Sequence, residues 1–516
     1  MAMKHKIESP FYPIVYVRGY AMRADEREET FYDTYYGFAA TSVEKRQAPA
    51  PKYWEADMFE GQLIRFMKLR DYAYADAVNR GENIPPSAPP RSLWVCRFYD
   101  RDYFDDKIRS IEDHARDLRD LVCKEIPDRL KAADVDVGPD NENFKVILIA
   151  HSMGGLVCRT LIQNILPFED KEDPKDWIHR LVTMGSPHRG IELSLIPDFV
   201  QRAIAQNLNP FDSNIFSPDR MRQYLKLESD YDVHSLGDEQ LPQAFPVKRC
   251  FCLIGSDHRS YGAVRYATGS YSDGLVKQSN AYIVAGPNPG KDKDYDDQHT
   301  AYYANVHRAH SGRRGIVNSY ESFENIQRFL FGDIRIRISL QNIEIQTSVE
   351  KGVDAFYDFE FFFSIRKSNA FLHRRQQDPC ENAFRFSREE LPKTLLLHTA
   401  FMNSALKDDA DERYSHFGMR FRVLERKVKP GMLWDTDYPE RQIYSEGLEV
   451  RIGDVDFKKR NTQVGYRWLS DAGDWTRAQR EPNGTYRLEL RGAGAIKADL
   501  VVEAAPWPDN NLTRDG

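Results

Sequence analysis

Ser152 stands at the centre of a short motif whose residue types can support nucleophilic chemistry. The motif reads Ala-His-Ser-Met-Gly from Ala150 to Gly154, and a second glycine follows it. A serine hydroxyl is a weak nucleophile at neutral pH, so it needs a neighbouring base and an exposed position. A sharp strand-to-helix turn provides that position, because small residues on either side of the serine let strand and helix approach closely. The motif therefore predicts Ser152 as a nucleophile.

The residues around the motif have the pattern that such a turn requires. The apolar run 144–150 predicts a buried strand before Ser152, and residues 154–166 predict a helix that Pro167 ends. The start of that helix would aim the backbone N–H of Met153 at an oxyanion developing on a substrate carbonyl. We expect the Met153 amide to be one donor of an oxyanion hole.

Two segments resemble known hydrolases. Residues 150–155 resemble the nucleophile elbow of bacterial lipases, especially the Bacillus type, in which alanine replaces the first glycine. Residues 185–190, Gly-Ser-Pro-His-Arg-Gly, are similar to a turn of the same lipases and of related GPI-deacylase-like (PGAP-type) serine hydrolases of the α/β-hydrolase superfamily. The resemblance extends in pieces over residues 13–331 and implies the α/β-hydrolase fold. It does not reach the C-terminal part of the chain.

The resemblance also implies a second donor for the oxyanion hole. In the lipases this donor follows a His-Gly pair at the end of the first core strand. The corresponding residues are Val17-Arg18-Gly19-Tyr20, with arginine in place of histidine. The implied donor is the backbone N–H of Tyr20. Because this donor is a main-chain group, Arg18 is compatible with a working oxyanion hole.

The acid is expected after Ser152, since α/β-hydrolases order their triad as serine, acid, histidine. Residues 270–276, Ser-Tyr-Ser-Asp-Gly-Leu-Val, resemble the stretch that holds the lipase acid and predict Asp273 in that role. Its carboxylate would hold the imidazole in one tautomer and stabilise the imidazolium. Asp257, which lies nearer the end of its strand, is the alternative.

The base is expected on a loop shortly before the last helix of the catalytic domain. The lipase histidine often reads His-x-Gly there, and His310-Ser311-Gly312 matches that pattern. Ser319 then suits the N-cap of a helix predicted over residues 320–331. The resemblance favours His310 as the base, and His307 is the alternative.

The periodicity of the chain predicts two domains. Residues 1–332 alternate apolar runs with helical patterns, which predicts an α/β-hydrolase domain with a mostly parallel sheet flanked by helices. Residues 191–247 are expected to form a cap or lid, with amphipathic helical spacing over 199–208, and aromatic residues within 31–59 are candidates for an acyl pocket. From residue 333 to 516 the alternation has period two, which predicts a C-terminal all-β, sandwich-like domain of unknown role.

Composition narrows the classes of ligand. The 516 residues have a net charge of −7, without the basic balance of a nucleic-acid-binding protein. The acidic stretch 292–297 lacks the glycine and terminal glutamate of an EF-hand, and the sequence shows no zinc-ligand spacing, so we expect no metal. The serine chemistry needs no cofactor. The N-terminus lacks the apolar run of a signal peptide, and no stretch has the length of a membrane helix. We expect synthesis in the cytoplasm, with non-classical export as one hypothesis.

Together these features predict a serine carboxylic-ester hydrolase, a lipase, phospholipase or esterase. It would act through an acyl-enzyme on lipid-like acyl esters and would contact a membrane surface. Two alternatives stay open: a catalytically silent binding protein on a hydrolase fold, and a lipase-type antibacterial effector. The C-terminal domain is a candidate site for a protein partner.

Overall fold

The chain divides into two compact units in the computed structural model. The first comprises Met1–Tyr303 and Arg308–Phe323, and the second comprises Ala304–His307 and Glu324–Gly516. The structure describes the following residues: 5–19, 43–47, 54–58, 61–75, 87–96, 109–138, 141–191, 214–241, 243–259, 271–290, 296–311, 315–366, 370–405, 414–430, 436–437, 439–453, 463–471, 473–491 and 495–508.

A seven-stranded sheet is the frame of the first unit, in the order β11-β10-β9-β8-β2-β6-β5. In this order, each strand from β10 across to β5 is parallel to its neighbour. Parallel strands are covered on both faces, which explains why they appear in the sequence as continuous apolar runs. The strands are β2 (Ile14–Val17), β5 (Ala73–Tyr74), β6 (Ser92–Cys96), β8 (Val146–His151), β9 (Ile178–Met184), β10 (Cys250–Gly255) and β11 (Tyr302–Val306).

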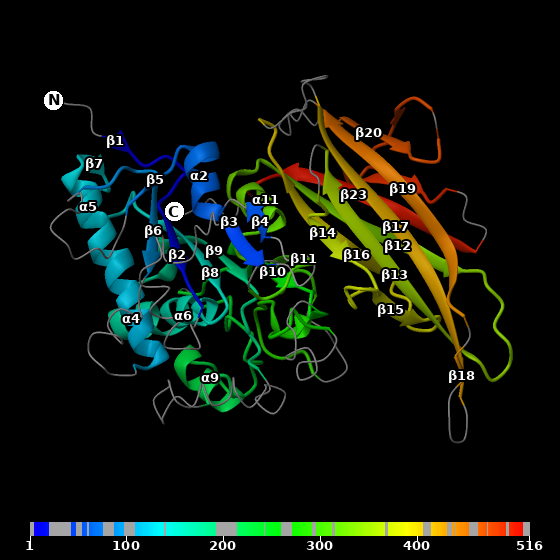
Figure 1. Cartoon of the computed structure of the whole chain (residues 1–516), viewed down its shortest axis with the longest axis horizontal. Coiled ribbons are helices and arrows are strands. Elements are labelled where there is room, and N and C mark those ends of the chain that lie inside the picture. Colours follow the sequence, from blue (N-terminus) through cyan, green and yellow to red (C-terminus); the bar gives the residue numbers. More distant parts are fainter. Residues whose placement is uncertain are drawn as a thin grey trace. The chain divides into compact units, whose positions relative to one another are not determined.

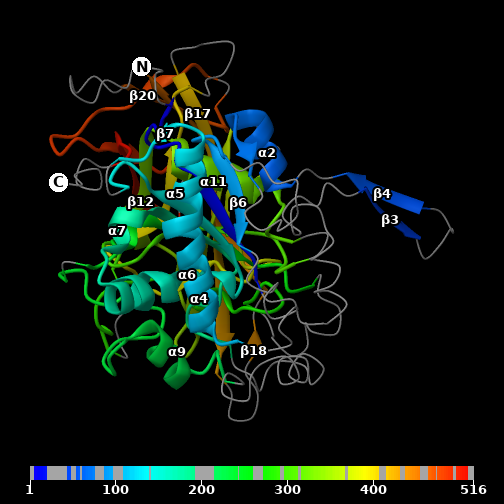
Figure 2. The ribbon, with the colours of Figure 1, turned by 90° about the vertical axis from the view of Figure 1, so that its left-hand side faces the viewer.

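Helices cover both faces of this sheet. Figure 1 shows α4 and α5 on one side of it and α2 on the other. Figure 2 shows α4 and α5 end to end, as one helical run that a π-helical stretch (Leu121–Glu125) joins. The helices of this unit are α2 (Gln62–Arg70), α4 (Ile111–Asp120), α5 (Ile126–Ala132), α6 (Gly154–Thr160), α7 (Pro174–Trp177) and α9 (Pro218–Leu225). A further helix, α11 (Tyr320–Phe331), begins in this unit and continues from Glu324 in the second. Short pairs β1 (His5–Lys6) with β7 (Val135–Asp136) and β3 (Val43–Gln47) with β4 (Trp54–Met58) complete the strands of this unit.

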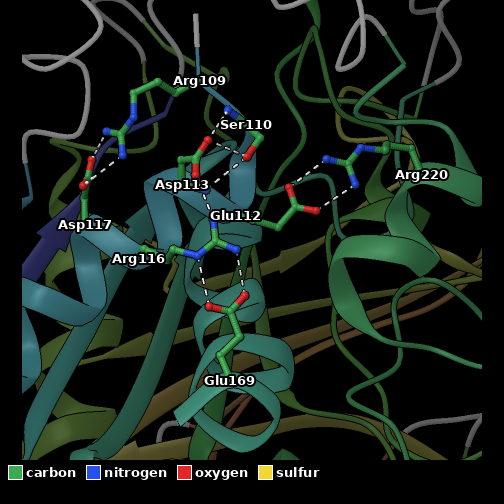
Figure 3. Close-up of polar contacts among 8 residues, drawn as sticks. All are labelled: Arg109, Ser110, Glu112, Asp113, Arg116, Asp117, Glu169 and Arg220. Carbon is green, nitrogen blue, oxygen red and sulfur yellow. Dashed lines mark hydrogen bonds and ion pairs between the residues drawn. The ribbon is translucent and has the colours of Figure 1, made fainter.

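Ion pairs join α4 to its neighbours (Figure 3). Arg220 of α9 binds Glu112 with both terminal nitrogens, at 2.8 and 2.7 Å. Arg116 binds Glu169 in the same bidentate way, at 3.0 and 2.7 Å. Bidentate guanidinium–carboxylate pairs fix direction as well as distance. The two pairs therefore attach α9 and the π-helical segment that follows α6 to successive turns of α4.

The helix after Ser152 does not end where the sequence pattern predicted. α6 continues without a break into a π-helical segment, Leu161–Asp170, which passes through Pro167. A proline in a regular α-helix lacks one donor, and its ring clashes with the carbonyl four residues earlier. The wider π-helical turn shifts that carbonyl away, so the helix accommodates the proline and ends at Lys171 with a φ of 63°.

The second unit is a sandwich of two antiparallel sheets. One has the order β16-β12-β23-β22, and the other follows β14-β13-β17-β19-β20-β21, with β15 on β13 and β18 on β17. Side chains from both sheets form one hydrophobic core, which includes Ile336, Phe361, Val423 and Val502. The strands are β12 (Ile334–Ile345), β13 (Asp354–Ile365), β14 (His373–Arg375), β15 (Phe384–Ser387), β16 (Thr394–Met402), β17 (Tyr414–Lys429), β18 (Thr436–Asp437), β19 (Arg441–Gly453), β20 (Gln463–Trp468), β21 (Thr476–Arg477), β22 (Tyr486–Glu489) and β23 (Ile496–Pro506).

The predicted fold class is confirmed: an α/β-hydrolase fold is followed by an all-β sandwich. The domain boundary at residue 332 and the cap over 191–247 stay predictions. The amphipathic pattern over 199–208 and most of the aromatic segment 31–59 lie outside the described residues. Among the residues that the structure does describe, no helix combines the length and the apolar character needed to cross a membrane.

Buried histidines make stability depend on pH. Burial lowers the pKa of His398, in the sandwich core, to about 3, and this ring lies against Phe363 and stacks on His373 with 4.1 Å between centroids. Between about pH 6.5 and 3 the unfolded chain binds a proton at this residue that the folded chain does not bind. The free energy of unfolding therefore falls as the pH decreases through that range, and His398 has no such effect above it.

We predict that His398→Phe removes this contribution while keeping an aromatic ring in the core. Urea unfolding of the second unit, followed by circular dichroism at pH 7 and pH 5, measures the effect. The loss of unfolding free energy between the two pH values should be about 2 kcal/mol smaller in the variant. Equal losses in both proteins would contradict the assignment of a neutral His398.

Candidate active site

Ser152 occupies the turn between β8 and α6 with a φ of 52°, a left-handed conformation that is rare for a residue with a side chain. The end of β2 and the turn after β9 approach the start of α6 so closely that no side chain fits at its first two residues. A Cβ at Gly154 would meet the carbonyl oxygens of Val17 and Arg18, the latter at 2.7 Å. A Cβ at Gly155 would collide with Ser186 Oγ. The small residues of the motif are thus required by the approach of β2 and of the turn after β9.

The end of β2 lies directly beside the nucleophile. Val17 pairs with Ala150, and a Cβ at Gly19 would lie 2.5 Å from the Cβ of Ser152. Met153 immediately precedes α6 and is buried. The amides at a helix start suit a developing oxyanion. Tyr20, the second donor expected from the sequence, lies outside the described residues.

The structure brings Ser152, His310 and Asp273 together in one hydrogen-bonded chain. His310 Nε2 is 3.0 Å from Ser152 Oγ, and His310 Nδ1 is 2.9 Å from Asp273 Oδ2. Asp273 and His310 are 1% and 3% exposed, so water hardly competes for their hydrogen bond. This arrangement can take a proton from the serine hydroxyl and stabilise the resulting imidazolium.

The Asp273 carboxylate is oriented by its own loop. Its Oδ1 accepts hydrogen bonds from the backbone N–H groups of Leu275 (3.0 Å) and Val276 (2.7 Å). Oδ2 is thereby directed to the imidazole, and the His310 N–H also donates to the Asp273 carbonyl at 2.9 Å. The acid and the base thus hold each other through backbone as well as side chain.

His151 supports the imidazole from the other side. Its Nε2–H donates to the His310 carbonyl at 3.0 Å, and the two rings lie 4.8 Å apart between centroids. Burial, and then the nearby charge of a protonated His310, hold the pKa of His151 well below its ordinary value. His151 is therefore neutral beside His310. The sequence did not predict this contact, although adjacency to Ser152 was a signal for it.

Gly185, the residue after β9, lies against both Asp273 and His310. Its φ is 55°, and a Cβ there would lie 2.9 Å from Asp273 Oδ2 and 3.2 Å from His310 Nδ1. The rest of the turn packs inward: His188 is buried, and its Nε2 lies 3.0 Å from Thr183 Oγ1. Burial lowers the pKa of His188 well below its ordinary value, so the ring is neutral.

The alternative acid and base have other surroundings. The N–H of Asp257 donates to the Arg308 carbonyl at 3.1 Å, and His310 Nδ1 meets Asp273 instead. His307 belongs to the second unit, where its Nδ1 lies 3.6 Å from Cys380 Sγ. The hydrogen-bonded chain that includes Ser152 thus contains Asp273 and His310.

An ion pair anchors the histidine loop to α11. Arg308 binds Glu321 with two nitrogens, at 3.0 and 2.7 Å, and both side chains are largely buried. Ser319 Oγ accepts the Ser322 N–H at 3.1 Å, so Ser319 is the predicted N-cap. Loop and helix start are therefore fixed relative to each other. Within the described residues, no group of three or more His, Cys, Asp or Glu side chains is arranged to hold a metal ion.

Comparison with known proteins gives a family match in the region of the elbow. The model of the PGAP1-like alpha/beta domain matches residues 99–222, which include Ser152 and the turn at Gly185. The resemblance to GPI-deacylase-like hydrolases is confirmed over this segment. No curated protein sequence matches the chain.

Three solved structures are similar at low identity. A metagenomic carboxyl esterase, MGS0156, has a TM-score of 0.29 and 13% identity, and the match covers 54% of this chain and 61% of the esterase. Phospholipase PlaB from Legionella pneumophila has a TM-score of 0.29 and 12% identity, over 84% of this chain and 91% of PlaB. A Tle4–Tli4 complex has a TM-score of 0.24 and 13% identity, over 59% and 82%. TM-scores this low carry no inference about activity.

The matched domain, the parallel sheet and the elbow agree with one another. They support a lipase-type hydrolase, and residues 99–222 are similar to the PGAP1-like α/β domain.

Proposed function

We propose that the protein is a serine carboxylic-ester hydrolase with Ser152 as nucleophile, His310 as general base and acid, and Asp273 as the orienting carboxylate. The single observation that carries the proposal is the chain of hydrogen bonds at 3.0 and 2.9 Å that joins these three side chains. Three side chains from separate loops satisfy the geometry of nucleophile, base and orienting group together. The proposed oxyanion donors are the amides of Met153 and Tyr20.

The acyl-enzyme forms in two steps, the formation and the collapse of a tetrahedral intermediate. Ser152 Oγ attacks the acyl carbonyl carbon while its proton passes to His310 Nε2, and the carbonyl oxygen becomes an oxyanion. The tetrahedral intermediate then collapses, the bond to the alcohol oxygen breaks, and His310 returns the proton to that oxygen. Asp273 stabilises the imidazolium between these steps, and each oxyanion donor contributes about 10²–10³ in rate.

Water then completes the reaction by the same route. His310 takes a proton from the water as it attacks the acyl carbon. The second tetrahedral intermediate breaks its bond to Ser152 Oγ, which recovers its proton from His310, and the carboxylic acid leaves. His151 stays neutral beside His310, so it does not compete for the transferred proton.

The proposed substrates are lipid-like acyl esters. The resemblance of the elbow and of the turn 185–190 to lipases supports this class, and so does the PGAP1-like match. Lipase, phospholipase and esterase activity all use the same residues. The acyl group and the alcohol must therefore be identified by experiment.

For the proposed function, the first prediction concerns the residues of the triad. Ser152→Ala and His310→Ala should each lower kcat on a p-nitrophenyl ester by roughly 10⁶, because a triad acts as one unit. Asp273→Asn should lower kcat by about 10⁴, since the imidazole loses its orienting carboxylate. Steady-state kinetics measures these losses, on purified variants whose circular dichroism spectra show that they are folded.

Asp257→Asn and His307→Gln are the matched controls, because the sequence offers Asp257 as the alternative acid and His307 as the alternative base. Both variants should keep a kcat close to that of the unchanged protein. A fluorophosphonate probe adds an independent readout, because its phosphorus reacts with the serine oxygen and fluoride leaves. Absence of Ser152-dependent labelling in the folded protein would favour the silent binding protein instead.

The second prediction concerns the acyl group. For a lipid-like substrate, kcat/KM on p-nitrophenyl esters should rise with chain length by up to about fourfold per methylene, the value of burying about 0.8 kcal/mol each. The measurement is a series from acetate to decanoate, run below the aggregation limit of each ester. A flat or falling profile would reject lipid-like acyl chains while leaving the serine chemistry intact.

A further inference from the structure

Arg159 is a fully buried arginine in the helix that leaves the elbow. It lies on α6, two turns after Ser152, with 0% of its surface exposed. Its Nε donates to Gln163 Oε1 at 2.9 Å, one terminal nitrogen to the His188 carbonyl at 3.1 Å and the other to the Ser235 carbonyl at 2.6 Å. One guanidinium thus connects the elbow helix to two segments that are distant in sequence.

Stability alone does not explain a cation in this position. Burial lowers the pKa of Arg159 to about 10, so the side chain is still charged at neutral pH. Its three acceptors are neutral oxygens, and the nearby Asp232 is itself bound to Arg189 at 2.7 Å. A well-packed apolar side chain is often as stable as a buried charge or more so. What a guanidinium adds is a rigid planar fork that directs several hydrogen bonds at once.

The neighbouring residues on the same face of the helix support this reading. Gly155, one turn before Arg159, leaves room for Ser186 of the turn after β9. Gln163, one turn after it, donates to the same Ser235 carbonyl at 3.1 Å. This face of the helix is therefore shaped to receive the turn at residues 185–190 and the backbone at Ser235.

The turn that Arg159 holds is in contact with the acid–base pair. Gly185 lies against Asp273 Oδ2 and His310 Nδ1, where not even a Cβ would fit. At its other end the turn is bonded to the loop of the acid: the Arg189 N–H donates to the Asn280 carbonyl at 3.1 Å, and Asn280 Nδ2 donates to the Gly190 carbonyl at 3.0 Å. A shift of this turn would therefore move the carboxylate and the imidazole relative to Ser152.

We infer that Arg159 is a positioning residue, whose guanidinium holds the turn 185–190 and thereby keeps the Asp273–His310 pair in register with Ser152. The kinetic part of this inference rests on the proposed function. The structural part does not, because the order of the turn and of the acid loop can be measured without any substrate.

The test uses the full chain with two substitutions. Arg159→Met removes the charge and all donors, whereas Arg159→Lys keeps the charge but replaces the fork by a single ammonium. Misplaced catalytic groups can lower rates by about 10², so Arg159→Met should lose 10- to 100-fold in kcat on a short soluble ester, with KM within about twofold. Arg159→Lys should fold normally and lose less kcat.

Arg220→Met is the matched control (Figure 3). It makes the same chemical change at an arginine of α9 that binds Glu112 with two nitrogens and holds α9 to α4. This variant should lower the melting temperature and leave kcat unchanged. A loss of kcat that tracks melting temperature across all three variants would overturn the positioning role.

Hydrogen exchange with mass spectrometry gives the readout that is independent of activity. Peptides covering 185–190 and 271–281 should exchange faster in Arg159→Met, and in part in Arg159→Lys, while those of β8 and α4 stay protected. Unchanged exchange in these two peptides, or unchanged kcat in a folded Arg159→Lys, would overturn the inference. If the unaltered protein hydrolyses no ester, the proposed function fails, and the exchange result still decides the structural part.

Discussion

The left-handed backbone of Ser152 is the constraint on which the other features of the site depend. This conformation costs about 1–2 kcal/mol for a residue with a Cβ, and it persists only because the surrounding structure enforces it. The end of β2 and the turn after β9 lie against the start of α6. They can approach it this closely because Gly154 and Gly155 have no side chains. The strained turn directs the serine hydroxyl toward the histidine loop.

The rest of the site is built from groups that hold one another by backbone hydrogen bonds. Two amides orient Asp273, the Asp273 carbonyl binds the His310 amide, and the His310 carbonyl accepts from His151. Each of these bonds has a backbone amide or carbonyl on at least one side, so few freely rotating groups have to be ordered to position the imidazole. Burial keeps His151, whose ring lies 4.8 Å from that of His310 between centroids, in its neutral form.

Several elements could be predicted from the sequence because their signals are local. The central strands are buried on both faces, so apolar runs mark them to within a few residues, as the run 144–150 marks β8 (Val146–His151). Pro167 misled the prediction because a π-helical turn accommodates it. In the sandwich, charged residues along β17 obscure its alternation over the full length, Tyr414–Lys429, so the sequence predicts the all-β domain more clearly than the bounds of this strand.

The sequence by itself determined the nucleophile motif and the order of the helices and strands around it, because a strand, a tight turn and a helix depend on neighbouring residues. Only the tertiary structure shows that His310 and Asp273 lie in the hydrogen-bonded chain with Ser152, a point that the sequence left open against His307 and Asp257. The partners in the hydrogen-bonded chain are 158 and 37 residues apart, and no local pattern reports which loops the sheet brings to the same edge. The contact of Arg159 with the turn at residues 185–190 likewise forms only when the helix after Ser152 packs against that turn. It joins the Arg159 side chain to the backbone carbonyl of His188, which lies 29 residues away in the sequence.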